Sequence, residues 1–158
     1  MTIANPFLVR ADEGQYVWRL GAMMRLLAVG AQTQGRFWLS ELTAPQGSGA
    51  GLHLHTREDE TFMVAEGELT VRVGDQPLEL GPGDIAYGPR NLPHSYRVES
   101  PNARFYVLGT PAGFENWFFE TGTKVDDPSS FPPPGFVEEF PDPATLAASL
   151  VKYGAKVL

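Results

Sequence analysis

Three histidines and one glutamate are the residues of this chain whose types and spacing could do chemistry together. His53 and His55 are two positions apart, so on a strand both imidazoles leave the same face of the sheet. Glu60 follows after a short polar turn and opens a new apolar run, which brings a carboxylate back beside the histidines. His94 completes the three histidines of the chain. Three imidazoles and one carboxylate predict a metal site.

The residues around this set resemble the first signature motif of the cupins. That motif asks for Gly, five residues, His-x-His, three or four residues, Glu, six residues and Gly. Its fixed positions are met by Gly47, His53, His55, Glu60 and Gly67. Glu58 and Asp59 are near rivals of Glu60. Only Glu60 keeps six residues to Gly67, so we interpret the other two as a solvated turn.

His94 lies in a segment that resembles the second cupin motif. This motif asks for Gly, five residues, Pro-x-Gly, two residues, His, three residues and Asn. Gly83, Pro89 and His94 match, whereas Asn91 stands where Gly is usual and Val98 where Asn is usual. Asn tolerates the left-handed backbone that Gly normally supplies, and the family's Asn is not a ligand. The departures therefore leave every metal donor in place.

Short apolar runs bounded by Gly, Pro and polar residues predict the strands. These runs are 16–20, 24–29, 36–42, 61–73, 85–87, 92–98 and 104–108. The alternation within 61–73, around Gly67, and the turn at Gly74-Asp75 are typical of hairpins. Closely spaced strands without long helical patterns between them imply a closed or sandwiched β domain. The Gly-rich segment 47–51 resembles a phosphate-binding loop only superficially, because neither Lys-Ser/Thr nor a helical pattern follows it.

The cupin resemblance is close over roughly residues 36–110 and implies the fold. We expect an all-β, single-domain cupin-type jelly-roll β-barrel with short C-terminal helices. Residues 1–35 would form an N-terminal arm and strands of the barrel, residues 36–110 the cupin barrel core, and residues 111–158 a C-terminal helical extension packed on it. In the arm, residues 7–9 would pair either with a partner's sheet or with the same barrel.

Two helices are predicted in the C-terminal extension. Phe114, Trp117 and Phe118 have helical spacing, with Gly122 placed to end the helix. The second helix begins at Asp142, which acts as its cap before a proline, and Leu146, Leu150 and Val151 would make its apolar face. Residues 127–135 between them are Pro-rich and are interpreted as an ordered linker.

Composition excludes several classes of function. The chain of 158 residues has no cysteine, so it has neither a disulfide framework nor a thiolate ligand. Its net charge of −7 argues against nucleic-acid binding, which rests on basic contacts to phosphate. No apolar run has the roughly 18 residues of a membrane span, and no signal peptide is recognisable. We expect a cytoplasmic protein.

The donor set suits one divalent transition metal ion, namely Mn, Fe, Co, Ni, Cu or Zn. Four protein ligands on an octahedral ion leave two adjacent positions for water, substrate or dioxygen, so the ion would serve as a Lewis acid. A structural zinc would instead close its shell at four ligands.

Among small cupins, the chain is similar to quercetin 2,3-dioxygenase-like proteins in the run from Glu60 to Gly67 and in its C-terminal Tyr153-Gly154. This resemblance implies ring-opening dioxygenation of an enolic or phenolic, flavonol-like small molecule. Glu60 would be the catalytic residue that takes the hydroxyl proton, which requires a pKa raised towards neutrality. Four aromatic residues are candidates for the substrate pocket, although each also suits ordinary core packing: Phe62, Tyr96, Phe114 and Phe118.

Two other functions stay open for the same fold. Cupins include metal-dependent decarboxylases and isomerases of small acids or sugars, for which a charged pocket wall would be expected. An aromatic wall favours dioxygenation. A cupin can also bind a small molecule without turnover. The resemblance and the N-terminal arm favour a homodimer formed through sheet or strand exchange.

Overall fold

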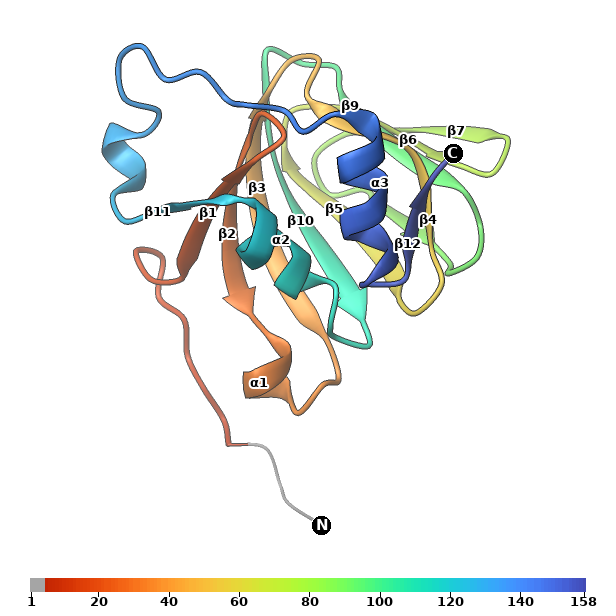
Figure 1. Cartoon of the computed structure of the whole chain (residues 1–158), viewed down its shortest axis with the longest axis horizontal. Helices are drawn as coiled ribbons and strands as arrows, with labels where there is room; N and C mark the ends of the chain where they lie inside the picture. The colour runs from red at the N-terminus through yellow and green to blue at the C-terminus, as the bar shows by residue number, and fades with distance from the viewer. Residues whose placement is uncertain (1–4) are drawn as a thin grey trace.

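The computed structural model describes residues 5–158, which form a sandwich of two antiparallel β-sheets (Figure 1). The strands of the larger sheet are, in spatial order, β11 (Thr123–Val125), β1 (Gln15–Arg19), β2 (Ala22–Ala28), β3 (Trp38–Pro45), β10 (Asn102–Thr110), β5 (Asp59–Glu66) and β8 (Ile85–Gly88). Those of the smaller sheet are β12 (Ala155–Val157), β4 (Gly49–His55), β9 (His94–Val98), β6 (Leu69–Val73) and β7 (Gln76–Leu80). The predicted jelly-roll fold is confirmed as an open sandwich rather than a closed barrel.

Alternation of side chains along the strands builds the core between the sheets. In β2, Ala22, Met24 and Leu26 are buried while the residues between them are partly exposed. Phe105 in β10 and Val71 in β6 are both completely buried. Because successive side chains of a strand point to opposite faces, each strand contributes one apolar row to the space between the sheets.

The chain crosses from one sheet to the other at Gly67. β5 and β6 belong to different sheets, so the predicted hairpin around Gly67 is wrong. Gly67 has a φ of 82°, and a Cβ there would lie 2.4 Å from the carbonyl oxygen of Asn102. Glycine is therefore required for both the turn and the close approach. The hairpin at Gly74-Asp75 is confirmed and joins β6 to β7.

The C-terminal segment contains two helices and two short strands. α2 (Glu115–Thr121) and α3 (Pro143–Val151) confirm the predicted helices, and the Asp142 carboxylate accepts hydrogen bonds from the first turn of α3. α1 (Gly30–Thr33) and the 3-10 helix η1 (Pro128–Ser130) are short additions. β12 pairs with β4 and β11 pairs with β1, so the segment returns to both sheets (Figure 1). No helix in residues 5–158 is long and apolar enough to cross a membrane.

The N-terminal arm is not a strand over residues 5–14. Phe7 and Leu8 are exposed there, so the prediction that this run adds a strand to its own barrel is wrong. An apolar run of three residues is too short to decide between a strand and a coil. Residues 1–4 of the predicted arm lie outside the described residues.

Candidate metal centre

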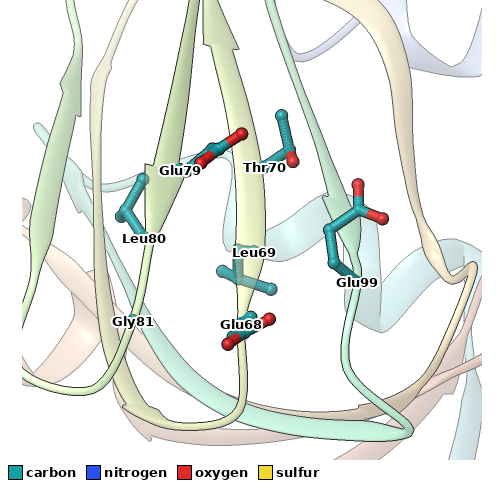
Figure 2. A pocket seen from close by; sticks show the side chains of 7 residues that line it. All are labelled: Glu68, Leu69, Thr70, Glu79, Leu80, Gly81 and Glu99. Carbon is teal, nitrogen blue, oxygen red and sulfur yellow. The ribbon is translucent and has the colours of Figure 1, made fainter.

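An acidic groove on the outer surface of the smaller sheet does not have the chemistry of a catalytic site. It has a volume of about 420 Å³ and lies along β6 and β7 (Figure 2). Its lining residues are Glu68, Leu69, Thr70, Glu79, Leu80, Gly81 and Glu99. The lining offers carboxylates without an imidazole, a cation or an aromatic ring, so it lacks the donor set of the predicted metal site.

The three histidines and Glu60 meet between the two sheets. His53 and His55 come from β4, and His94 lies opposite His53 at the start of the neighbouring β9. Glu60 comes from β5 of the other sheet. One ligand atom from each residue lies within 4.8 Å of those of the other three. The structure therefore brings together the four residues that the sequence predicts as metal ligands.

In two of the imidazoles, the Nδ1 atom faces a backbone carbonyl oxygen. His53 Nδ1 lies 2.7 Å from the oxygen of Gly51, and His94 Nδ1 lies 3.0 Å from that of Leu92. A carbonyl can only accept, so both Nδ1 atoms carry the proton. The Nε2 of each ring is then directed away from the backbone, and His94 Nε2 lies 3.1 Å from the Glu60 carboxylate. Imidazoles that present Nε2 in this way are typical metal ligands.

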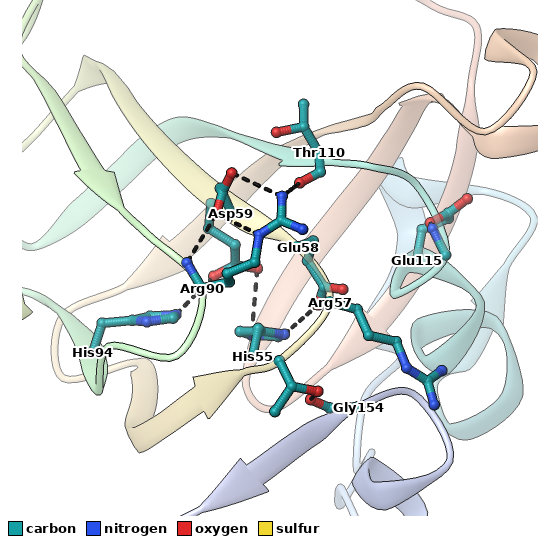
Figure 3. A network of polar contacts seen from close by, with 12 residues as sticks. His55, Arg57, Glu58, Asp59, Arg90, His94, Thr110, Glu115 and Gly154 are labelled. Atoms are coloured by element: carbon teal, nitrogen blue, oxygen red, sulfur yellow. Dashed lines mark hydrogen bonds and ion pairs between the residues drawn. The ribbon is translucent and has the colours of Figure 1, made fainter.

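His55 has a carboxylate at each ring nitrogen. Its Nδ1 contacts Glu58, and its Nε2 lies 3.7 Å from a Glu60 oxygen (Figure 3). His55 Nε2 is buried and makes no hydrogen bond with any described residue. Glu58 is only 3% exposed, so its interpretation as part of a solvated turn is wrong. A buried carboxylate needs a partner, and the backbone turn lets Glu58 reach back to His55.

Asp59 joins the start of β5 to the loop before β9. Its carboxylate accepts hydrogen bonds from the backbone N–H of Arg90 at 2.9 Å and from Arg90 Nε at 2.9 Å (Figure 3). Arg90 also donates to the carbonyl of Thr110 at 3.3 Å. Asp59 thus points away from the histidines and belongs to an ion pair, which the sequence interpretation did not anticipate.

The two departures from the second cupin motif have simple structural consequences. Asn91 adopts a φ of 65°, the left-handed conformation predicted for this position, and its N–H donates to the carbonyl of His55 at 2.7 Å. The loop before β9 is therefore tied to the strand that carries His53 and His55. Val98 is completely buried in the core and lies outside the histidine cluster.

The pKa values in the cluster depend on burial and on the charges that its side chains exert on one another. Burial alone would raise the pKa of Glu60, but the imidazoles of His55, His94 and His53 outweigh it and lower that pKa to about 2. The expectation of a raised pKa for Glu60 is therefore wrong. Burial lowers the pKa of His53 to about 4. Burial also opposes protonation of His55, but Glu60 and Glu58 outweigh it and raise the pKa of that imidazole.

A cavity of about 280 Å³ opens beside the cluster and is largely apolar. His53, His55 and Glu60 line it. Its lining also includes the four aromatic pocket candidates, Phe62, Tyr96, Phe114 and Phe118. Sequence reasoning missed several further lining residues, which come from β1, β3, α2, α3 and β12: Arg19, Trp38, Trp117, Leu146, Leu150 and Val157. Arg19 ends β1 and shares the inward face of that strand with Val17, and this alternation was the one local signal of its burial.

These residues fit a divalent metal ion. Two imidazoles hold their Nδ1 protons against backbone carbonyls, the buried Nε2 of His55 has no hydrogen-bond partner among residues 5–158, and Glu60 is ionised beside all three rings. Imidazole and carboxylate donors suit several divalent transition metals. His53, His55, Glu60 and His94 would hold the ion, and the ion would supply a Lewis acid next to the cavity.

Comparison with known proteins agrees with the fold. Residues 40–109 match the family model described as "Cupin domain". The chain is 30% identical over 119 residues to quercetin 2,3-dioxygenase from Bacillus subtilis, covering 75% of this chain and 35% of that protein. It is 26% identical over 117 residues to quercetin 2,3-dioxygenase from Aspergillus japonicus, covering 70% and 33%. The chain thus spans about a third of the length of these curated relatives.

A solved structure shares the fold at lower identity. An RmlC-like cupin from Shewanella frigidimarina superposes with a TM-score of 0.60 at 17% identity, covering 72% of this chain and 99% of that one. The domain match and this superposition agree with the sandwich of sheets. This chain therefore has the cupin fold, and its residues 40–109 match the cupin domain.

Proposed function

We propose that this protein is a metal-dependent dioxygenase that acts on an enolic or phenolic small molecule. The observation that carries the proposal is the predominantly aromatic and apolar wall of the cavity beside the histidine cluster. Such a wall suits a planar, weakly polar substrate better than a sugar. The similarity to two quercetin 2,3-dioxygenases supports the same reaction class, although the chain spans only a third of their length.

Glu60 is assigned the role of proton acceptor. It lines the cavity, is 6% exposed, and its low pKa keeps it ionised and able to accept a proton. A carboxylate with a pKa of about 2 is a weak base, so the hydroxyl that it deprotonates must be made more acidic. A divalent ion held by the cluster would supply that acidity and could bring the substrate and dioxygen together.

The aromatic residues have positioning roles in this proposal. Phe62 and Tyr96 lie with ring centroids 5.7 Å apart, and Phe114 packs edge-on against Phe118 at 5.3 Å. Burial and the nearby Glu60 charge raise the pKa of Tyr96, so its phenol stays a neutral hydrogen-bond donor. Together these rings would exclude water around a flat substrate and leave one polar group to orient its oxygen.

The first experiment measures metal content and oxygen uptake on the same protein preparation. Protein purified without added metal should contain stoichiometric Mn, Fe, Co, Ni or Cu and should consume oxygen with quercetin or with a member of a catechol panel. The His53→Ala variant should lose both properties, because it removes one of four donors. Arg97→Ala is the matched control, since Arg97 is exposed on β9, the strand that carries His94.

The two readouts separate the metal site from the reaction. Bound metal without oxygen uptake on any flavonol or catechol would reject the dioxygenase assignment while leaving the metal centre intact. A preparation that refuses all of these ions would reject the metal centre itself.

A further inference from the structure

Arg19 is a buried cation in an otherwise apolar part of the cavity wall. It is 7% exposed, follows the buried Val17 on the inward face of β1, and lines the same cavity as His53 and Glu60. None of the other lining residues is a lysine or an arginine. A guanidinium stays charged in proteins, so the cavity contains one permanent positive charge outside the histidine cluster.

The guanidinium of Arg19 has no ionic partner among residues 5–158. It makes no ion pair within 4.0 Å and no hydrogen bond with them, and its buried Nε has no hydrogen-bond partner. Burial lowers the pKa of Arg19, and the charge of Glu138 raises it by a smaller amount. The oxygens of Glu138 instead accept from Trp18 Nε1 at 2.8 Å and from the N–H groups of residues 20 and 21 at 2.7 and 2.9 Å.

Packing alone does not account for a charge at this position. The guanidinium carbon of Arg19 lies 4.9 Å from the centre of the Trp117 ring, a cation–π contact that orients the group. Such a contact does not supply a hydrogen-bond acceptor, and the buried Nε of Arg19 has none among residues 5–158. Buried charges are normally paired and hydrogen-bonded, because an unpaired one loses its hydration without compensation. An anion that enters the cavity would provide the missing partner.

Arg19 and Glu60 are at opposite sides of the cavity wall. Their strands, β1 and β5, are separated by β2, β3 and β10 in the larger sheet. Packed rings connect the two ends of the cavity: the Arg19 guanidinium carbon lies 4.9 Å from the Trp117 ring centre, and the Phe114 ring lies 5.5 Å from Trp117 and 4.3 Å from the His55 ring. Both side chains line the cavity from these strands. One ligand can therefore present a hydroxyl to the histidine cluster and a second group to Arg19.

We propose that Arg19 recognises a carboxylate on the substrate, so that the substrate class is a small phenolic or enolic acid with an aromatic body. This inference rests on the proposed function, whose substrate it specifies. A single planar guanidinium matches a carboxylate with two parallel hydrogen bonds. A phosphate would require more donors than this apolar wall provides. The carboxylate lies at the end of the substrate that does not react.

The test compares pairs of probes that differ only in charge. Binding of 4-hydroxybenzoate and 4-hydroxycinnamate is compared with binding of the corresponding amides, 4-hydroxybenzamide and 4-hydroxycinnamamide. Calorimetry and the fluorescence of Trp117 and Trp38 measure affinity on the protein as purified, with its metal and without oxygen. We expect at least one acid to bind about tenfold or more tightly than its amide. Arg19→Met should abolish this preference, and Arg19→Lys should retain part of it.

Folding stability provides the second readout. Met keeps the apolar length of the side chain, and it removes a charge without a partner, so Arg19→Met should not lower the unfolding midpoint. A purely structural role would lower the midpoint and leave the preference for the acid unchanged. Arg97→Met, at an exposed position on β9, is the matched control and should alter neither quantity.

Three results would overturn the proposal. They are equal binding of acid and amide by the unmodified protein, a preference that survives in Arg19→Met, and failure of all four probes to bind. Oxygen uptake is not part of this measurement, so anion recognition and the dioxygenase reaction can fail separately. Arg19-dependent binding of acids without oxygen uptake would reject the reaction alone, and oxygen uptake with flavonols but no preference for acids would reject the role of Arg19 alone.

Discussion

At the scale of single residues, Glu58 connects the metal cluster to the surrounding fold. It is buried, follows β4 by three positions, and contacts the Nδ1 atom of His55. The other two imidazoles use backbone carbonyls for the same purpose. A carboxylate at this position polarises the ring more strongly than a carbonyl does, which makes Nε2 a better metal donor. His55 is therefore the histidine whose affinity for metal depends on a side chain.

We predict that Glu58→Gln weakens metal binding by about 10- to 100-fold. The amide keeps the size of the side chain and removes its charge. Competition of Co²⁺ between the protein and a chelator of known affinity measures the effect without relying on activity. Asp75→Asn serves as the control, because Asp75 is an exposed carboxylate in the Gly74-Asp75 turn. Equal affinities of Glu58→Gln and the unmodified protein would contradict the role of Glu58.

The ion pair of Asp59 and Arg90 should make stability depend on pH. Hydrogen bonds from the Arg90 side chain and backbone lower the pKa of Asp59 to about 2, from an ordinary value of 3.8. Because the folded-state pKa is the lower one, the stabilisation is fully present above about pH 4. It is lost as the pH falls towards 2. The effect should be at most about 1 kcal/mol, since part of the pair is exposed.

Urea unfolding of the unmodified protein and of Asp59→Asn measures this effect. The difference in the free energy of unfolding should be present at pH 6 and should shrink at pH 2.5. A constant difference across this range would mean that the Asp59 charge does not contribute. Asp75→Asn should show no difference at either pH, because Asp75 is fully exposed.

The sequence predicts a residue of this site only where it lies a few positions from the other residues of a short motif. His53 and His55 share one strand face, and the positions of Glu60 and His94 follow from their short motifs. Glu58 was misinterpreted because its orientation depends on how the turn after β4 folds back, which spacing does not encode. Arg19 was missed because it comes from β1, and its place in the cavity depends on the packing of the two sheets.

At the scale of elements, the C-terminal segment completes the cavity. Phe114, the N-cap residue of α2, lines it together with Trp117 and Phe118 from α2 and Leu146 and Leu150 from α3. Leu146 and Leu150 pack on the core, whereas Val151 is 62% exposed, so the prediction that Val151 belongs to the apolar face of α3 is wrong. The helix α3 therefore covers the cavity with Leu150, a side chain that also belongs to the hydrophobic core.

We predict that Leu150→Ala lowers the free energy of unfolding by about 2–3 kcal/mol, near the low end for buried leucines because the residue already borders a cavity. Leu150→Met should cost less than about 1.5 kcal/mol, since it preserves volume. Urea unfolding measures both. A change below about 1 kcal/mol for the alanine variant would show that α3 does not pack on the core as described.

Elements with a repeating apolar pattern were predicted, and those without one were not. The long strands show alternation, and α2 and α3 have helical spacing with recognisable caps. β11 and β12 contain three residues each, too few for a period to appear, and they exist because they extend sheets that are already formed. The crossing at Gly67 was misread because a chain that changes sheets and a hairpin use the same turn residues.

At the scale of the whole molecule, the edge strand β8 is a candidate surface for the predicted homodimer. Ile85 and Tyr87 are exposed on this strand, which ends the larger sheet. An exposed strand edge with apolar side chains is a template for pairing. We predict a mass near twice 17.3 kDa by light scattering, and a shift towards 17.3 kDa in Ile85→Lys. A monomeric unmodified protein would contradict the homodimer.

The pairing of β12 with β4 places Val157 and Leu158 beside the strand that carries His53 and His55. Val157 lies opposite His53 in the ladder and lines the cavity, and the N–H of Leu158 donates to the carbonyl of Leu52 at 3.0 Å. Any polypeptide fused after Leu158 would emerge beside the cavity that Val157 lines. An affinity tag for kinetic work therefore belongs at the N-terminus, because a C-terminal tag would act as an unintended competitor for the cavity.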